Sequence, residues 1–396
     1  MLADRIHRIN PSATLEMTAK AAELKRLNKP MYNMSVGEPD FSTPLHIQKA
    51  AQFAIANDYT KYTPGSGTHE LKSAIVAKIK RDNNLDYSLE NVIVSCGGKH
   101  SLYNACQVLF QSGDEVIIFS PYWVSFPDFV SITGAKPVFV KTNPSKQFEP
   151  DLEDLKNKIN NKTKGIIINS PSNPTGGVWS NEAMLEVYDI CKNKNIWMFS
   201  DECYEQLVYG QKFDSFASLV PDNSRVLTFQ SCSKTYAMTG WRIGYTIGDS
   251  KIVSAMSKLQ GQSTSCPNSI AQYAATEALL GNQKCVIEMR KVFEKRRNLI
   301  LQELNKNKNI TCEIPKGAFY VFPDFSHYLN SQDKNNKIMK NSTDLAMYIL
   351  NETGVVSVAG DSFGSSGHIR FSYATSEETI KTAMSLTNQA LQKLIF

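Results

Sequence analysis

The sequence predicts an α/β fold with a mostly parallel central sheet, followed by a smaller α+β domain. From about residue 90, short apolar runs alternate with helical patterns, and several runs are rich in Val and Ile, as buried parallel strands are. The alternation changes after about residue 285. A chain of 396 residues is also long enough for one large domain and one smaller domain.

The apolar runs predict the strands of the large domain in chain order. They cover Val92–Ser95, Glu115–Ser120, Pro137–Val140, Gly165–Asn169, Ile196–Ser200, Val226–Phe229 and Ile243–Ile247. Helical patterns between them include Ser101–Gln111, Leu152–Ile159 and Asn181–Lys194. Ligands of such a fold bind at the carboxyl ends of the strands.

The C-terminal part begins with a long charged helix, expected at about Val286–Asn305. It continues with the run Ala318–Phe322, a polar loop near Asn330–Asn341, a helix from about Thr343, the strand His368–Tyr373 and a closing helix that starts at Ser376–Glu378. The first 44 residues are interrupted by prolines and are expected to run outside the main sheet. We therefore predict an N-terminal arm that joins the small domain (1–44), a large domain (45–285) and a small C-terminal domain (286–396).

The composition excludes several classes of protein. Apolar residues make up 42% and charged residues 20%, and the net charge of +5 comes from interspersed charges, so nucleic-acid binding is not expected. No stretch of about 18 uncharged apolar residues predicts a membrane span. The eight cysteines form no C-x-x-C motif, which argues against a zinc site or a disulfide framework and fits a reducing cytoplasm. The first residues lack the apolar core of a secretory signal.

The segment around Lys234 carries the most specific chemistry. Ser231 and Ser233 precede this lysine and Arg242 follows it eight residues later. Hydroxyls and a guanidinium can hold a phosphate, and a lysine amine can hold an aldehyde as a Schiff base. Pyridoxal 5'-phosphate (PLP) carries both groups. Serine and lysine are also common in turns, so the segment needs support from elsewhere in the chain.

Two further strand ends supply groups that PLP requires. Gly97, Gly98 and Lys99 lie between a strand and a helix, where backbone N–H groups bind anions. Asp201 can pair with the pyridine nitrogen, and Tyr204 can donate a hydrogen bond to the phenolic oxygen of the ring. Taken alone, each could be structural: a tight turn at the glycines and a helix cap at Asp201.

Asn173 and Trp123 follow two more predicted strands. Asn173, in a turn rich in Pro and Asn, can reach the phenolic oxygen and a substrate carboxylate, although such composition usually marks a plain turn. Trp123 can stack on the pyridine ring, although a Trp more often packs in a core. The combination is specific because each strand end provides a different group for one cofactor.

These residues give the chain a clear resemblance to the fold-type I, PLP-dependent aminotransferases, within the class I aspartate aminotransferase family. The fold of that family has helices on both faces of the central sheet. The matching motifs extend over nearly the whole chain and stand at Pro11–Thr14, Gly37–Phe41, Lys61–Pro64, Ser120–Val124, Asn169–Gly176, Ser200–Glu205, Lys234–Tyr245, Gly317–Tyr320 and Arg370–Ala374.

The resemblance implies a role for each cofactor residue. Lys234 would bind PLP as a Schiff base and then act as the general base. Asp201 would pair with the pyridinium, and Trp123 would stack on the ring with Cys203 behind the other face. The phosphate would be held by Arg242, Ser231, the backbone at 97–99 and Ser233.

The resemblance also implies substrate and partner contacts. Arg370 would bind the substrate α-carboxylate in a bidentate manner, helped by Asn173 and the backbone N–H of Gly37. Tyr62 would reach the cofactor phosphate of a neighbouring subunit, which implies a homodimer with shared sites. Lys99, with Ser12 and Thr14, would bind the distal carboxylate of a substrate.

These roles imply amino transfer between L-aspartate and 2-oxoglutarate. Relatives in the same branch accept prephenate, and some of them carry a basic residue where this chain has Asn10, which makes prephenate less favoured. An aromatic aminotransferase and a PLP-dependent C–S lyase remain alternatives. A PLP-bound regulator would place a winged helix before this fold, and it is not expected because the first motif starts at Pro11.

Overall fold

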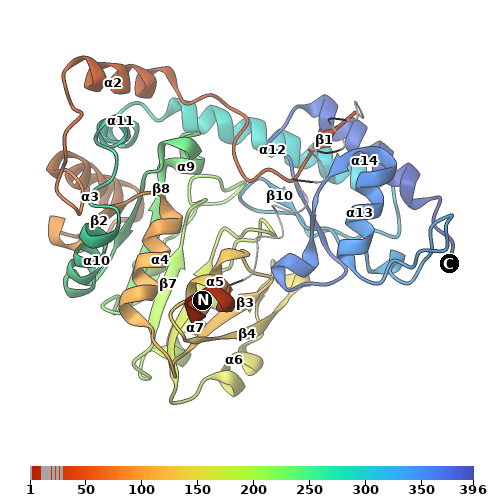
Figure 1. The fold of residues 1–396 in the computed structure, drawn as a ribbon, viewed down its shortest axis with the longest axis horizontal. Coiled ribbons are helices and arrows are strands. Elements are labelled where there is room, and N and C mark those ends of the chain that lie inside the picture. Colours follow the sequence, from red (N-terminus) through yellow and green to blue (C-terminus); the bar gives the residue numbers. More distant parts are fainter. Residues whose placement is uncertain (1, 10–18, 20–22, 24–25, 27–29) are drawn as a thin grey trace.

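The structure is a computed structural model that describes residues 2–9, 19, 23, 26 and 30–396. At its centre lies an eight-stranded sheet (Figure 1). Its strand order is β2-β9-β8-β7-β6-β3-β4-β5. The strands are β2 (Val92–Ser95), β3 (Glu115–Ser120), β4 (Lys136–Asn143), β5 (Glu149–Pro150), β6 (Thr163–Asn169), β7 (Trp197–Asp201), β8 (Val226–Ser231) and β9 (Gly244–Ile247). Each predicted strand of the large domain is therefore present, with ends that differ by at most three residues.

The sheet is mixed, with parallel pairing through its middle. All neighbours from β8 to β4 are parallel, whereas β9 is antiparallel to both β8 and β2. Gly244, the first residue of β9, pairs with both Ser231 and Ser95, which end β8 and β2. The start of β9 therefore lies at the same edge as the carboxyl ends of the parallel strands.

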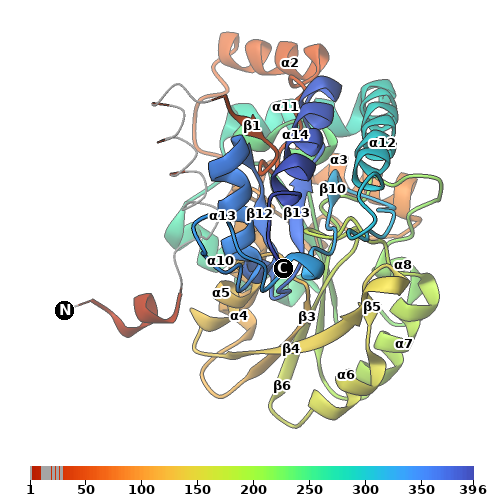
Figure 2. The ribbon, with the colours of Figure 1, turned by 90° about the vertical axis from the view of Figure 1, so that its right-hand side faces the viewer.

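Helices cover both faces of the sheet because side chains alternate along each strand. Val116 and Ile118 of β3 pack with one group of helices, whereas Ile117 and Phe119 pack with another. Figure 2 shows α4 and α5 on one side of the strands and α7 and α8 on the other. These groups comprise α4 (Gly98–Leu109), α5 (Ser125–Ser131) and α10 (Ser250–Ser263) on the first face, and α6 (Leu152–Lys158), α7 (Asn181–Cys191) and α8 (Phe216–Leu219) on the second.

A further group of helices packs against the β2–β9 end of the sheet. Val92 and Val94 of β2 and Tyr245 and Ile247 of β9 form a core with this group. The group contains α2 (Leu45–Ala56), α3 (His69–Asn83) and α11 (Ser269–Leu280). Thr68 caps the start of α3, where its hydroxyl accepts a hydrogen bond from Leu71 N.

The C-terminal part has its own core and two small sheets. The helices are α12 (Lys284–Leu304), α13 (Ser342–Thr353) and α14 (Glu377–Leu391). The strands β10 (Tyr320–Val321), β13 (Ile369–Ser372) and β12 (Val358–Ala359) form an antiparallel sheet in that order, and β1 (Tyr32–Asn33) pairs with β11 (Val355–Val356). The predicted closing helix is present, capped by Ser376, whose hydroxyl accepts from Thr379 N.

The N-terminal arm contributes β1 outside the main sheet, as the prolines predict. In Figure 1, α12 runs from the α11 side of the molecule toward α13 and α14. Its first turn places Val286 in the β2–β9 core, and Phe293 lies in the C-terminal core. The domain boundaries at 44/45 and 285/286 stay a prediction.

The remaining short elements are mostly single helical turns. They are α9 (Cys232–Thr235), η1 (Asp4–Arg8), η2 (Leu89–Asn91), η3 (Pro144–Lys146), η4 (Thr239–Trp241), η5 (Ser326–Tyr328) and η6 (Gly360–Phe363). Among the described residues, none of the helices has the length and apolar character that a membrane span requires.

Candidate active site

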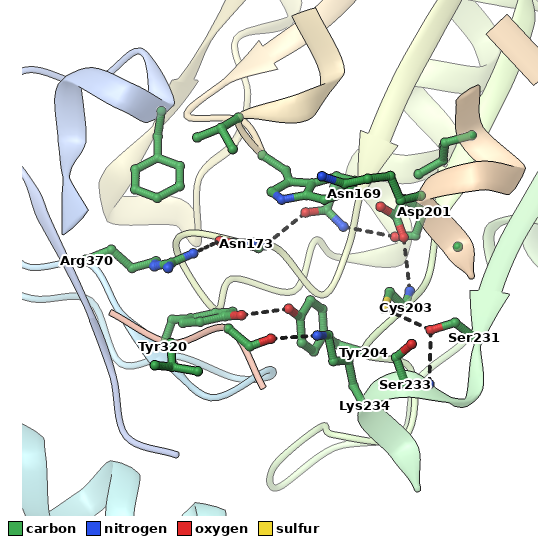
Figure 3. A pocket seen from close by; sticks show the side chains of 18 of the residues that line it. Asn169, Asn173, Asp201, Cys203, Tyr204, Ser231, Ser233, Lys234, Tyr320 and Arg370 are labelled. Carbon is green, nitrogen blue, oxygen red and sulfur yellow. Dashed lines mark hydrogen bonds between the residues drawn. The ribbon is translucent and has the colours of Figure 1, made fainter. Parts of the chain in front are cut away.

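A cavity of about 480 Å³ lies where the strands β6, β7 and β8 end. Segments of the N-terminal arm and the C-terminal part close its opposite side, so residues far apart in the sequence meet there (Figure 3). The lining residues are Asn33, Ser35, Val36, Gly37, Gly98, Lys99, Leu102, Trp123, Val124, Asn169, Asn173, Asp201, Cys203, Tyr204, Ser231, Ser233, Lys234, Arg242, Tyr320, Phe363 and Arg370.

Lys234 enters the cavity from the short helix α9. Ser231 caps this helix by accepting a hydrogen bond from Ser233 N, which fixes the turn that presents the lysine. The Lys234 ammonium donates to the carbonyl oxygen of Gly37 over 2.5 Å. Burial lowers the pKa of Lys234, because desolvation disfavours its charged form. The amine is thereby brought closer to the neutral form that attacks a carbonyl.

Arg242 and the start of α4 form a cradle for an anion. Gly97 has φ +91°, and a Cβ there would lie 2.3 Å from Nη2 of Arg242, so only glycine permits this approach. A Cβ at Gly244 would lie 2.2 Å from Gly98 N, so β9 also needs glycine to pass the helix start. The N-terminus of α4, the guanidinium and the Ser231 hydroxyl thus border one side of the cavity, where a phosphate is favoured.

Asp201 ends β7 with its carboxylate in the cavity wall. Its side chain is 6% exposed, and Oδ1 accepts a hydrogen bond from Cys203 N over 3.2 Å. Burial raises the pKa of Asp201 to about 7, while the Cys203 N–H and the positive charge of Lys234 act in the opposite direction. A positively charged N–H group placed here would favour the ionised carboxylate.

Two asparagines connect the ends of β6 and β7. Asn169 Nδ2 donates to the carbonyl oxygen of Asp201 over 3.1 Å, and Asn169 Oδ1 accepts from Asn173 N over 2.9 Å. Asn173 is therefore held over the cavity by the strand that lies next to Asp201. Asn173 was predicted from the sequence, whereas the supporting role of Asn169 was not, although the motif Asn169–Gly176 contains both residues.

Trp123 follows β3, and its ring is fixed by edge contacts with Phe126 and Phe129. The Lys99 ammonium lies 5.1 Å from the centroid of this ring, a cation–π contact. Burial, and then the charge of Arg242, lower the pKa of Lys99. Trp123 and Lys99 thus present a flat aromatic face and a partly desolvated cation to the same cavity.

Tyr204 and Tyr320 form a buried pair of hydroxyls 2.8 Å apart. A Cβ at Gly37 would lie 3.0 Å from the Tyr320 hydroxyl, so Gly37 leaves room for this pair. Burial raises the pKa of both hydroxyls, so both stay protonated donors at neutral pH. The role of Tyr204 was predicted from the sequence, whereas that of Tyr320, which ends the motif Gly317–Tyr320, was not.

Arg370 reaches the cavity from β13, on the side opposite the main sheet. Nη1 donates to Asn173 Oδ1 and Nη2 donates to the carbonyl oxygen of Ser35, each over 2.7 Å (Figure 3 shows the first). Its guanidinium lies 4.5 Å from the ring centroid of Tyr320 and 5.0 Å from that of Phe363. The contacts from Ser35 and Phe363 could not be read from sequence, because one uses a main-chain carbonyl and the other an ordinary apolar residue.

The charge of Arg370 is buried without an acidic partner. Arg370 is 5% exposed, its Nε has no hydrogen-bond partner within the described part of the chain, and it forms no ion pair with a described acidic side chain. An unpaired buried cation is costly. The arrangement therefore favours an anionic ligand such as a carboxylate.

The structure brings together most of the predicted site residues. Gly97 contacts Arg242 beside the cavity without lining it, and Cys203 lines the cavity with its sulfur 3.4 Å from the Ser231 hydroxyl. Tyr62 is 90% exposed and does not line the cavity of its own chain. Ser12, with the motif Pro11–Thr14, lies outside the described residues. No group of three or more His, Cys, Asp or Glu side chains in the described residues is arranged to hold a metal ion.

Comparison with known proteins places the whole chain in one family. Residues 29–385 match the family described as aminotransferase class I and II. The chain is 44% identical to a probable aspartate/prephenate aminotransferase of Rhizobium leguminosarum bv. phaseoli, over 96% of each protein. It is 41% identical to an aspartate aminotransferase of Bacillus subtilis, over 99% of each.

Solved structures give the same result for the fold. The aspartate aminotransferase of Rhizobium meliloti superposes with a TM-score of 0.96 at 40% identity, covering 100% of this chain and 99% of that one. The aspartate aminotransferase of Thermus thermophilus with maleate superposes with a TM-score of 0.92 at 37% identity, covering 98% and 99%. These relatives and structures cover 96–100% of the chain at 37–44% identity, and the chain belongs to the class I and II aminotransferases, with the fold-type I architecture.

Proposed function

We propose that this protein is a PLP-dependent aspartate aminotransferase, which moves the amino group between L-aspartate and 2-oxoglutarate and yields oxaloacetate and L-glutamate. One observation carries the proposal. A half-buried lysine, a buried carboxylate and a buried guanidinium without a counter-ion face one cavity, at Lys234, Asp201 and Arg370. The names of full-length relatives at 41–44% identity support the same activity.

The donor set of the cavity fits PLP. Glycine at position 97 lets the Arg242 guanidinium approach the N-terminus of α4, so both could bind one phosphate. Burial raises the pKa of Asp201, and a pyridinium N–H beside this carboxylate would lower it again. Lys234 offers an amine whose lowered pKa suits Schiff-base formation with the aldehyde. Bound PLP supplies a ring that withdraws electrons from the substrate α-carbon.

Three residues of the cavity have separate roles in the reaction. Lys234 would hold PLP through its amine and, with that amine free, would act as the general base that takes the proton from the substrate α-carbon and as the acid that gives it back. Asp201 would pair with the pyridine nitrogen and keep it protonated. Tyr204 is a buried hydroxyl donor whose natural acceptor is the phenolic oxygen of the ring.

Arg370 sets the orientation of the substrate. Its two terminal nitrogens are already aligned by Asn173 and by the Ser35 carbonyl, and the planar guanidinium matches a carboxylate. A fixed α-carboxylate holds the α-proton toward Lys234. The reacting groups are then oriented before the proton is transferred, which lowers the entropic part of the barrier. Lys99 provides a cation for a second carboxylate, which favours dicarboxylic substrates.

A dimeric assembly in the cytoplasm completes the proposal. Tyr62 is exposed and does not line the cavity of its own chain, which supports the expectation that it reaches the cofactor phosphate of a neighbouring chain. All eight cysteines are free thiols. Free thiols are typical of a reducing compartment.

A second activity, prephenate transamination, is favoured by a specific comparison. Two relatives named aspartate/prephenate aminotransferase, from R. leguminosarum and Nitrosomonas europaea, are 44% and 42% identical to this chain. Prephenate also carries two carboxylates, so Arg370 and Lys99 can serve both substrates.

The decisive experiment follows the visible absorbance of the purified holoprotein. The Schiff-base band should disappear on addition of L-aspartate and return on addition of 2-oxoglutarate, because each half-reaction is reversible and separate. Prephenate as acceptor tests the second activity. Release of pyruvate and ammonia from a β-substituted amino acid, without any oxo acid, would instead identify a C–S lyase. Absence of any exchange with aspartate would refute the proposal.

A further inference from the structure

A buried polar network lies behind the turn that follows β7, on the side away from the cavity. Its members are Lys78 of α3, Glu202 and Glu205 of the turn, Gln230 of β8 and Tyr245 of β9, and each is at most 7% exposed. None of these side chains belongs to the set of residues that the sequence patterns predict for the site. Charged side chains are rarely buried to this extent unless they are fully paired.

Lys78 uses all three of its N–H donors within the network. Its ammonium donates to Glu205 Oε1, to Gln230 Oε1 over 2.8 Å and to Asn83 Oδ1 over 3.4 Å. Glu205 is the carboxylate closest to this lysine. The positive charge is therefore neutralised inside the core by a residue of the active-site turn.

Gln230 connects the two glutamates. Its amide nitrogen donates to Glu202 Oε2 over 3.1 Å and to Glu205 Oε2 over 3.0 Å. Its carbonyl oxygen accepts from Lys78 and, over 3.3 Å, from the Tyr245 hydroxyl. Both donors and both acceptor positions of this amide are occupied, so only one orientation of Gln230 satisfies the network.

Glu202 is anchored from four directions. Oε1 accepts from the Ser200 hydroxyl over 3.0 Å, the Ser215 hydroxyl over 2.8 Å and Phe216 N over 3.1 Å, and Oε2 accepts from Gln230. This number equals the acceptor capacity of a carboxylate. The main chain at residue 202 is thus fixed from its side-chain end.

The network alternates with the active-site residues along the chain. Glu202 lies between Asp201 and Cys203, and Glu205 follows Tyr204 directly. Gln230 directly precedes Ser231. In each case one residue faces the cavity and its neighbour belongs to the network, so the same short stretch of main chain carries both.

We propose that this network positions Asp201 and Tyr204 for the reaction, through Glu202 and Glu205. None of its members lines the cavity, so they are positioning residues rather than catalytic ones. The inference rests on the proposed function, because it assigns a role toward the cofactor. A displacement of about 1 Å at a reacting group can lower a rate about a hundredfold.

The test is the variant Glu205→Gln, which keeps the shape of the side chain. Either orientation of the new amide sets an N–H donor against Lys78 or against the amide nitrogen of Gln230, so the network cannot re-form. We expect kcat for aspartate to fall about 10- to 100-fold. The KM for aspartate should stay within about threefold, because Arg370 makes no contact with the network. PLP should also bind more weakly to the variant apoprotein than to the wild-type apoprotein, measured by the quenching of tryptophan fluorescence.

Glu303→Gln is the matched control. Glu303 is also 7% exposed and also pairs with a lysine, Lys306, over 2.6 Å, but it lies in α12 away from the cavity. This variant should leave kcat and PLP affinity unchanged. Thermal unfolding of both variants reports any loss of stability, so assays run well below both midpoints separate positioning from simple destabilisation.

Further outcomes decide between the inference and a purely structural role of the network. A folded, PLP-loaded Glu205→Gln protein with wild-type kcat would overturn the inference, as would an equal loss of kcat in Glu303→Gln. If Glu205→Gln does not fold, Ser215→Ala removes a single hydrogen bond from Glu202, and its kcat should still fall severalfold at unchanged KM. An unchanged kcat in that variant would overturn the inference. Failure of the wild-type protein to exchange amino groups with aspartate would instead refute the proposed function, and the inference with it.

Discussion

Arg370 Nη1 donates a hydrogen bond of 2.7 Å to Asn173 Oδ1 across 197 positions of the chain. Arg370 belongs to the small antiparallel sheet, whereas Asn173 follows β6 of the main sheet. The bond therefore joins the two parts of the molecule at the cavity. It also fixes the guanidinium plane before any substrate binds, which lowers the entropic cost of binding a carboxylate.

We predict that Arg370→Lys mainly weakens substrate binding. A lysine cannot form the bidentate contact, and the loss of one charge-assisted hydrogen bond is about 1.5–3 kcal/mol. The value of kcat/KM for aspartate should fall about 10- to 100-fold, mostly through KM. Arg297→Lys is the control, because Arg297 also lies over an aromatic ring, that of Tyr209, outside the cavity. Steady-state kinetics with an unchanged KM for Arg370→Lys would contradict the role of Arg370.

We predict that Lys234→Ala removes both the covalent link and the general base. Loss of a general base alone lowers rates by about 10²- to 10⁴-fold. Borohydride reduction and peptide mapping should find a pyridoxyl adduct at residue 234 of the wild-type protein and none in the variant. Turnover at the normal rate in Lys234→Ala would show that another residue is the base.

Lys234 also gives a pH dependence to the stability of the apoprotein. Burial lowers its pKa in the folded state, so the unfolded chain binds more protons between that lowered pKa and about 10.5. The free energy of unfolding contributed by this group therefore rises with pH in that window. Urea titrations of the apoproteins should show this rise in the wild type and its absence in Lys234→Ala.

We predict the opposite sign for Asp201. Its pKa is about 7 in the folded apoprotein and 3.8 in the reference state, so the folded state binds more protons between these values. Stability from this group is therefore lost as the pH rises from about 4 to 7. The free energy of unfolding of the Asp201→Asn apoprotein, relative to that of the wild type, should rise by about 2–3 kcal/mol between pH 5 and pH 8. Its kcat as holoprotein should fall about 10²- to 10³-fold, because a charge stabiliser is removed.

The measurement for Asp201 is a pair of urea titrations of each apoprotein, at pH 5 and at pH 8. Glu202 also has a pKa raised to about 7, mainly by burial and then by Glu205. It is present in both proteins, so its contribution cancels in the difference. A difference that does not change with pH would mean that Asp201 is already ionised in the folded apoprotein.

We predict that Tyr62→Phe weakens PLP binding although Tyr62 does not line its own cavity. A hydrogen bond from a tyrosine to a phosphate in the neighbouring subunit would contribute about 1.5–3 kcal/mol, so the dissociation constant should rise about 10- to 100-fold. Tyr59→Phe, three residues earlier and also exposed, serves as the control. Sedimentation should report a dimer for both variants. An unchanged PLP affinity in Tyr62→Phe would exclude the shared site.

We predict that Lys99→Met selectively impairs dicarboxylic substrates. Lys99 offers the cavity a partly desolvated ammonium, and without it the distal carboxylate loses its charged partner. The value of kcat/KM should fall about 10- to 100-fold for aspartate, and much less for an amino acid with a neutral side chain. An equal loss for both substrates would assign Lys99 to the cofactor rather than to specificity.

Much of the fold could be predicted from local sequence patterns. The Val- and Ile-rich runs located every strand of the large domain except the two-residue β5, since a buried strand needs a continuous apolar segment. Ser376 marked the start of α14 because capping is a local interaction. Helices α2, α3 and α11 were not identified, because the alternation of short strands and helices gave no signal for their packing at the β2–β9 end.

Four site residues could be placed at one edge of the sheet from the sequence, because each lies near the end of a strand and the carboxyl ends of parallel strands meet at the same edge. They are Lys234, Asp201, Asn173 and Trp123. The antiparallel direction of β9, which puts Arg242 at that edge, is set by pairing between strands and is invisible in the order of residues. The Arg370–Ser35 contact depends on a main-chain carbonyl, and the Lys78–Glu205 pair joins positions 127 residues apart. Short-range patterns thus determined which chemical groups the protein carries and where its strands lie. Tertiary packing alone decided which buried charges meet, because ion pairing and desolvation depend on distances in space that no local spacing encodes.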